Sequence, residues 1–235
     1  MELSFKALAL ILAALAVRVR CQTPFDMNGG SVLAMAGKNC VAVAVDKRFG
    51  VGPQMIDSSA KRVIKIHNKL LTGLGGFDSD VQTIMAQPRR TLKLAATSAA
   101  PFCRRRRPPR RSRRPIAPGP FSAYLGQLLW ERRLFVTPVI AGLDAGDEPF
   151  LCMQDSLGAP VNSKDFVVCG TSSDSLFGIC EAMYKENLST DELFEVVEKC
   201  IISALERDCL GGYGAFIHMI TPDGILTREI SCRND

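Results

Sequence analysis

Acid chemistry in this chain could centre on Asp46, which directly follows a stretch from Cys40 to Val45 that alternates alanine with valine. Such a stretch suits a buried strand, and a strand end holds a carboxylate rigidly. Lys47 and Arg48 come next, and an acid beside cations at a strand end is a common way to build the floor of an active site. It is also an ordinary way to end a strand. Whether Asp46 takes part in catalysis therefore depends on which side chain the neighbouring strand places beside it.

Two glycine- or hydroxyl-rich motifs are weaker candidates. The stretch from Leu71 to Asp78 has the glycine spacing of a dinucleotide-binding loop, but Asp78 stands at the third glycine position and would repel a phosphate. The stretch from Cys169 to Asp174 lacks the pattern of a nucleophile elbow, so its hydroxyl groups are expected to cap the helix that follows. Neither motif predicts a cofactor site.

Metal and disulfide chemistry are also disfavoured. His67 and His218 are the only two histidines, and neither has the partner spacing of a metal ligand. The nine cysteines are an odd number without a C-x-x-C pair, which indicates reduced thiols in a reducing compartment. The net charge of +5 comes from a single run, because the eight arginines between positions 104 and 114 contribute +8 and leave −3 for the rest. A basic fold is therefore not indicated.

Short apolar segments bounded by turn residues predict a strand group before any helix. The expected elements are strands at Ser31–Ala36, Cys40–Asp46, Val63–His67 and Leu70–Gly73, a helix starting at Asp78 or Ser79 and kinked or shortened by Pro88, a helix at Phe121–Arg133, strands at Pro138–Asp144, Phe150–Gln154 and Phe166–Thr171, a helix from a capping box at Ser189–Glu192 to Arg207, and a closing hairpin of Gly214–Ile220 and Ile225–Ile230. This order predicts an α+β fold with two stacked antiparallel sheets and helices outside them, because it does not form alternating βαβ units.

Several short segments together resemble the beta subunits of the proteasome, which belong to the N-terminal-nucleophile hydrolases. They are Asn28–Gly30, Gly37–Ala42, Arg48–Gly50, Asp80–Thr83, Pro138–Asp144 and Asp165–Val168. The likeness extends to the non-catalytic type-3 class and covers most of residues 28–235. It implies a four-layer αββα sandwich with helix pairs on the outer faces.

The resemblance also implies which positions would carry catalysis. Catalytic members use an N-terminal threonine that supplies both the hydroxyl nucleophile and an amine base. Counting back from Asp46 places Gly30 at the threonine position, and glycine has no side-chain nucleophile. Arg62 stands where the family has a lysine, and arginine cannot exchange a proton as a tuned lysine can.

The remaining family positions are also altered. Cys169 stands at one serine position and Gly211 at another, so only Asp46 and Asp208 survive. No catalytic residue is therefore expected, and Asp46, Arg62 and Asp208 are expected to form a structural ion-pair cluster. An alternative nucleophile, Ser31, is one residue along the strand. The strand period predicts that its side chain points to the opposite sheet face, away from Asp46 and Arg62.

The resemblance implies a non-catalytic structural subunit of the 20S proteasome core particle, which supports assembly and the ATP- and ubiquitin-dependent degradation of proteins by sister subunits. By resemblance, its partners are other beta subunits and alpha-ring subunits in the cytoplasm and nucleus, and no cofactor is expected. Two alternatives stay open. One is an active hydrolase that uses Ser31, and the other is a protein that contacts nucleic acid through the arginine run.

The expected domain organisation has two parts. Residues 1–27 form an N-terminal extension that is either signal-like or a mispredicted start, and residues 28–235 form the beta-type domain. Within that domain, the arginine- and proline-rich stretch at about 101–120 is expected to be a disordered insertion. The side-chain and terminal carboxylates of Asp235 are a candidate site for a divalent cation shared with a neighbouring subunit.

Overall fold

The computed structural model describes residues 27–86 and 116–232. Two five-stranded antiparallel sheets and a two-stranded hairpin contain all the strands of these ranges. The first sheet has the order β10-β1-β2-β11-β12. Its strands are β1 (Ser31–Gly37), β2 (Cys40–Asp46), β10 (Phe166–Gly170), β11 (Ala215–Thr221) and β12 (Gly224–Ile230).

The second sheet has the order β5-β6-β7-β8-β9, so β5 and β9 are its edge strands. Its strands are β5 (Val63–His67), β6 (Leu70–Gly76), β7 (Val136–Leu143), β8 (Pro149–Gln154) and β9 (Pro160–Ser163). A separate hairpin of β3 (Phe49–Val51) and β4 (Gln54–Asp57) extends beyond the end of β2.

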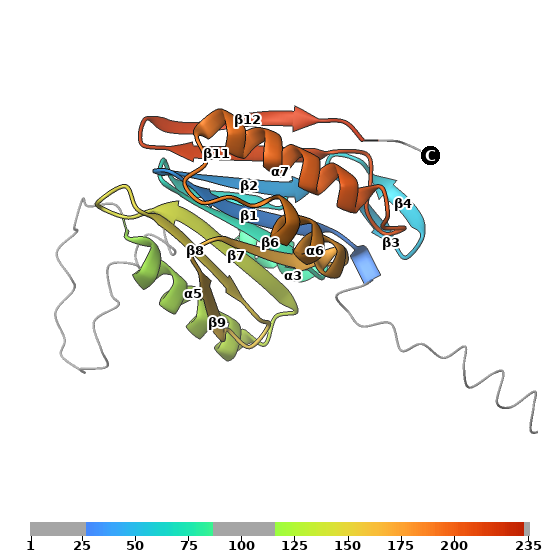
Figure 1. The fold of residues 1–235 in the computed structure, drawn as a ribbon. Coiled ribbons are helices and arrows are strands. Elements are labelled where there is room, and N and C mark those ends of the chain that lie inside the picture. Colours follow the sequence, from blue (N-terminus) through green and yellow to red (C-terminus); the bar gives the residue numbers. More distant parts are fainter. Residues whose placement is uncertain (1–26, 87–115, 233–235) are drawn as a thin grey trace, which may run out of the picture.

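Two helix pairs cover the outer faces of the sheets. α6 (Ser173–Met183) and α7 (Thr190–Leu205) pack on the first sheet, and α3 (Asp78–Ala86) and α5 (Pro118–Arg132) pack on the second. Figure 1 shows α6 and α7 on one side of the stacked sheets, with α5 beside β8 and β9 on the other. The predicted four-layer αββα architecture is therefore confirmed.

The alternation of alanine and valine in β2 explains how the layers pack. Ala42 and Ala44 face α6 and α7 together with Leu33 of β1, where small side chains let the helices approach the sheet closely. Val41 and Val43 face the other way and help to fill the layer between the two sheets. Both faces of β2 are buried because it is the central strand of its sheet.

Most predicted elements are confirmed within one to three residues. The capping box of α7 is present, since the Ser189 side chain accepts the amide N–H of Glu192 and the Glu192 carboxylate accepts that of Ser189. The strands β3, β4 and β9 were not predicted, because β3 has only three residues and β4 and β9 are short and largely exposed, so none has a clear apolar pattern.

One boundary of the expected insertion at 101–120 is wrong. Pro118 begins α5 and is buried, so the residues from Pro118 to Pro120 form a helical first turn. Proline suits this position because its fixed φ fits a helix and its missing N–H would have no partner there. Residues 101–115 lie outside the described ranges, as do Pro88, the N-terminal extension up to residue 26, and Asp235.

Candidate functional site

The β1–β2 hairpin brings Asp46 and Gly30 to one end of the first sheet. Val32 pairs with Val45, which places the start of β1 beside the end of β2. Asp46 is fully buried, and its Oδ1 accepts a hydrogen bond from the amide N–H of Arg48 at 2.9 Å. Its Oδ2 is also buried and has no hydrogen-bond partner among the described residues. A buried carboxylate with one free oxygen is therefore the acidic centre of this site.

Gly30 adopts a backbone conformation with φ of +105°, and the space beside it is filled by Arg62. A Cβ atom at Gly30 would lie only 1.2 Å from Nη1 of Arg62. That guanidinium is almost completely buried, and its Nη1 donates a hydrogen bond to the carbonyl oxygen of Gly29 at 2.7 Å. The position expected to carry a nucleophile is therefore occupied by a cation from β5's N-terminal flank.

Asn28 and Arg48 tie the same segment to its surroundings, and neither was predicted as a site residue. Arg48 is buried and donates from Nη1 to the carbonyl oxygen of Leu210 and from Nη2 to that of Gly52, both at 2.9 Å. The Asn28 amide donates to the carbonyl oxygen of Gly50 and accepts the N–H of Asp78. The position of Asn28 before two glycines was the available signal, because an amide can bond both donors and acceptors there.

Asp208 lies in the loop after α7 and is hydrogen-bonded to the two residues that precede α6. Its Oδ2 accepts hydrogen bonds from the hydroxyls of Thr171 at 2.6 Å and Ser172 at 2.7 Å. The prediction that these hydroxyls cap the following helix is wrong, since Ser172 is the N-cap residue but makes no side-chain capping bond. A Cβ at Gly211 would lie 3.5 Å from Oδ2 of Asp208, so the two hydroxyls bind the carboxylate close to this glycine.

The three charged residues do not form the expected ion-pair cluster. Arg62 binds backbone carbonyls and Asp208 binds hydroxyls, and none of the ion pairs between described residues joins either of them to Asp46. Burial raises the pKa of Asp46 from 3.8 to about 7, and the Arg48 N–H and the charge of Arg62 offset only part of this effect. The interaction of Asp46 with Arg62 is thus longer-range and electrostatic.

Neither of the other candidate nucleophiles is activated. Burial raises the pKa of the Cys169 thiol to about 11, so it is protonated at neutral pH and contacts the carbonyl oxygen of Thr137. The Ser31 hydroxyl is fully buried and accepts the N–H of Ser172 at 3.1 Å. Neither the Cys169 thiol nor the Ser31 hydroxyl is hydrogen-bonded to a side-chain base among the described residues.

The predicted direction of Ser31 is partly wrong. Ser31 alternates with Val32 and so shares the helix-covered face of β1 with Leu33. Asp46 shares that face too, because its cross-strand partner Ala215 also packs in the helix-side core. The strand period therefore separates Ser31 from Arg62 but does not separate it from Asp46.

Residues 27–86 and 116–232 contain no group of three or more histidine, cysteine, aspartate or glutamate side chains placed to hold a metal ion. Within these ranges, no helix combines the length and apolar character needed to cross a membrane. The seven described cysteines are all free thiols.

The comparisons with known proteins agree with this architecture. The sequence profile described as "Proteasome subunit" matches residues 27–100 and 121–220. Proteasome subunit beta type-3 of Oryza sativa subsp. japonica is 41% identical over 214 residues, which cover 90% of this chain and 98% of that protein. The corresponding protein of Drosophila melanogaster is 39% identical over 212 residues, or 88% of this chain and 97% of that protein. The chain therefore belongs to the proteasome subunit family.

Proposed function

We propose that this chain is a non-catalytic beta subunit of the 20S proteasome core particle, of the type-3 class. Its role is structural, in that it supports assembly while sister subunits hydrolyse peptide bonds. The observation that carries the non-catalytic assignment is the Arg62 guanidinium, which fills the space a side chain at Gly30 would need. The names of the similar proteins support the class.

Peptide hydrolysis requires a nucleophile and a group that removes its proton. Gly30 offers no hydroxyl, and Arg62 remains protonated at neutral pH and so cannot act as the base. Asp46 has a pKa near the working range, but it is sealed in the sheet with no hydroxyl donor bonded to it among the described residues. Asp46 therefore has no nucleophile hydrogen-bonded to it, among the described residues, that it could deprotonate for peptide hydrolysis.

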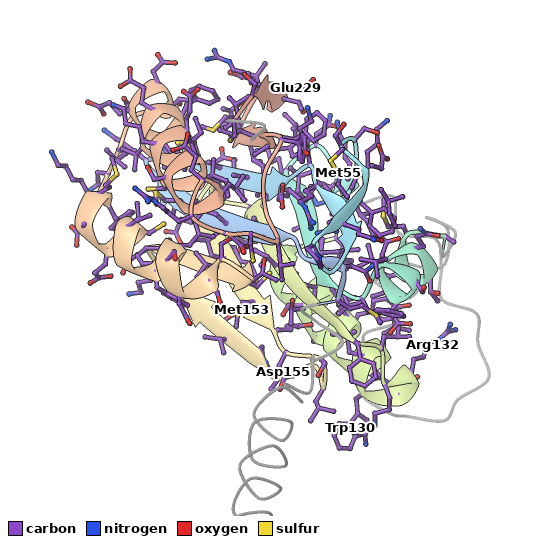
Figure 2. The ribbon with its side chains drawn as sticks, turned by 90° about the vertical axis from the view of Figure 1, so that its right-hand side faces the viewer. Met55, Trp130, Arg132, Met153, Asp155 and Glu229 are labelled. Atoms are coloured by element: carbon purple, nitrogen blue, oxygen red, sulfur yellow. The ribbon has the colours of Figure 1, made fainter. Side chains whose placement is uncertain are left out.

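Exposed apolar side chains support contacts with other subunits. Val51, Met55 and Ile56 on the β3–β4 hairpin are 40–59% exposed, and Trp130 at the end of α5 is 56% exposed. Figure 2 shows Met55 and Trp130 projecting outward at separate places on the surface. We assign these surfaces to neighbouring beta and alpha-ring subunits, in a particle of the cytoplasm and nucleus.

The domain organisation belongs to the same proposal. The family match begins at residue 27, which supports a beta-type body from Asn28 onward. It is interrupted between residues 100 and 121, which supports an insertion in the arginine- and proline-rich stretch. The cation site at Asp235 stays a prediction, because this residue lies outside the described ranges.

The assembly role is tested by purifying the tagged full-length chain from its native cells under non-denaturing conditions. Co-migration with a large particle that also contains other proteasome subunits is expected. A matched variant, Ile56→Lys together with Met55→Lys, removes apolar surface without touching the core and should lower the fraction in the particle. Quantitative recovery of the unmodified chain as a free monomer would contradict the proposal.

A further inference from the structure

A cavity of about 300 Å³ opens between the two sheets, at the edge formed by β5 and the β11–β12 hairpin. It is lined by side chains from five strands and from the residues before β5. The lining comprises Val45, Lys61, Arg62, Val63, Lys65, Leu71, Phe216, His218, Ile225 and Thr227.

The cavity exists because the apolar side chains that fill the layer between the sheets end at this edge. Val45 and Leu71 belong to the buried inter-sheet layer, and Val63 and Ile225 pack at its margin. The next inward-facing positions on the two edge strands are Lys65 and Thr227, whose polar ends do not fill an apolar space. The result is a pocket with aliphatic walls and a polar mouth.

The charge of the lining has one sign. Lys61, Arg62 and Lys65 are cationic, and no acidic side chain lines the cavity. Lys61 and Lys65 are exposed and form no ion pair with any described residue. Glu229, labelled on β12 in Figure 2, is already paired with Lys47.

Arg62 supplies a second, independent feature. It is 2% exposed, and its two terminal nitrogens are directed to the carbonyl oxygens of Gly29 and Asn28. Its Nε is buried without a hydrogen-bond partner among the described residues. A buried donor of this kind favours an acceptor from a bound ligand, since leaving it unsatisfied costs about 1–3 kcal/mol.

We propose that this cavity binds a medium-chain aliphatic carboxylate. The alkyl chain lies against Val45, Val63, Leu71 and Ile225, and the carboxylate faces Lys61, Lys65 and Arg62. A peptide fits the lining less well, because the Thr227 hydroxyl is already hydrogen-bonded to His218 at 2.8 Å and the walls offer little else to pair with amide groups.

Octanoate is the probe, titrated into the full-length chain and, in a second series, into the assembled particle by calorimetry at low salt. Saturable binding at one site per chain is expected. Octylamine and 1-octanol, which keep the tail but lack the negative charge, should bind at least about tenfold more weakly.

Variants separate this cavity from non-specific binding. Lys65→Glu should weaken octanoate binding about tenfold or more, because it reverses the charge at the mouth. Lys164→Glu is the matched control, since Lys164 is also exposed, lies between β9 and β10 and does not line the cavity. Val63→Trp should abolish binding by filling the space, and circular dichroism checks that each variant is folded.

Three outcomes would overturn the proposal. They are no saturable octanoate binding by the folded chain, equal binding of octylamine, and equal loss of affinity in Lys65→Glu and Lys164→Glu. Incorporation into the particle is measured separately, so a failure of ligand binding and a failure of the assembly role give different results.

Discussion

At the scale of single residues, the main feature of the site is the close contact between Gly30 and Arg62. The guanidinium occupies the space where a side chain at position 30 would lie. The Arg62 side chain reaches the backbone carbonyls of Gly29 and Asn28, and Gly30 leaves it room to do so because it has no Cβ. The two positions therefore complement each other, and restoring one of them alone creates a conflict. Hydrogen bonds from the Arg62 guanidinium to the carbonyl oxygens of Gly29 and Asn28 hold this glycine segment in place.

Gly30→Thr is expected to destabilise the chain and to create no peptidase activity. The new Cβ would collide with the Arg62 guanidinium at a φ that side chains rarely adopt, and the expected cost is about 3 kcal/mol. Chemical denaturation measures this loss, with Gly178→Ala as the control, because nothing lies within 4 Å of a Cβ at that helical glycine. Threonine-dependent hydrolysis of fluorogenic peptides in particles with inhibited sister sites would contradict the prediction.

Asp46 is expected to make stability depend on pH in an unusual direction. Burial raises the pKa of Asp46 from 3.8 to about 7, so the folded chain binds a proton that the unfolded chain has released between these values. Its contribution to stability is therefore greatest at low pH and is lost as pH rises toward 7. Above pH 7 the unfavourable contribution is constant.

Asp46→Asn should remove this dependence, because the amide keeps an oxygen for the Arg48 N–H and carries no charge. The free energy of unfolding of the variant relative to the wild type should increase by about 2 kcal/mol from pH 5 to pH 8. Asp223→Asn, in the exposed turn between β11 and β12, is the control. A difference that is flat with pH, or that falls, would show that Asp46 is ionised throughout.

The sequence predicted part of this site but not the hydrogen bonds that Asp208 accepts. The sequence alone shows that Gly30 has no side-chain nucleophile and that Asp46 and Asp208 are acidic. The sequence could not show that Thr171 and Ser172 turn toward Asp208, 37 and 36 residues further on, because that choice depends on how α6 and α7 pack. The local sequence favoured helix capping by these hydroxyls. They donate to the Asp208 carboxylate in the folded chain, because hydrogen bonds to a charged acceptor are stronger.

At the scale of elements, α7 is the helix whose start is most strongly specified. Ser189→Ala removes the hydroxyl of the capping box and should cost about 1 kcal/mol of unfolding free energy. Ser175→Ala, at an exposed position in α6, is the control and should change stability by only a few tenths of a kcal/mol. A smaller loss for Ser189→Ala than for the control would contradict the assigned cap.

Elements with a strong apolar period were predictable, and short ones were not. The stripe of α7 and the alternation of β2 bury their side chains almost completely, which is why their patterns are clear. All four residues of β4 are exposed, and three of the four in β9 are too, so neither strand carries such a signal. Their pairing follows from neighbouring strands, which a single sequence does not reveal.

At the scale of the whole molecule, the isolated chain is expected to self-associate. The apolar side chains on the β3–β4 hairpin and Trp130 at the end of α5 are exposed among the described residues. Sedimentation velocity should show oligomers that Ile56→Lys reduces, while Leu226→Lys, at an exposed position of β12, should have a smaller effect. A monomer over the full concentration range would contradict this assignment of the hairpin surface.

The central claim is that this subunit carries no active site, and the state of its own N-terminus in the native particle tests it most directly. The particle is treated with an epoxyketone or similar electrophile that labels N-terminal nucleophiles, and this chain is then examined by intact and peptide mass spectrometry. An unlabelled chain with an unbroken peptide through Gly29, Gly30 and Ser31 is predicted. A chain beginning at Gly30 or Ser31, with the electrophile bound to that residue, would contradict the claim.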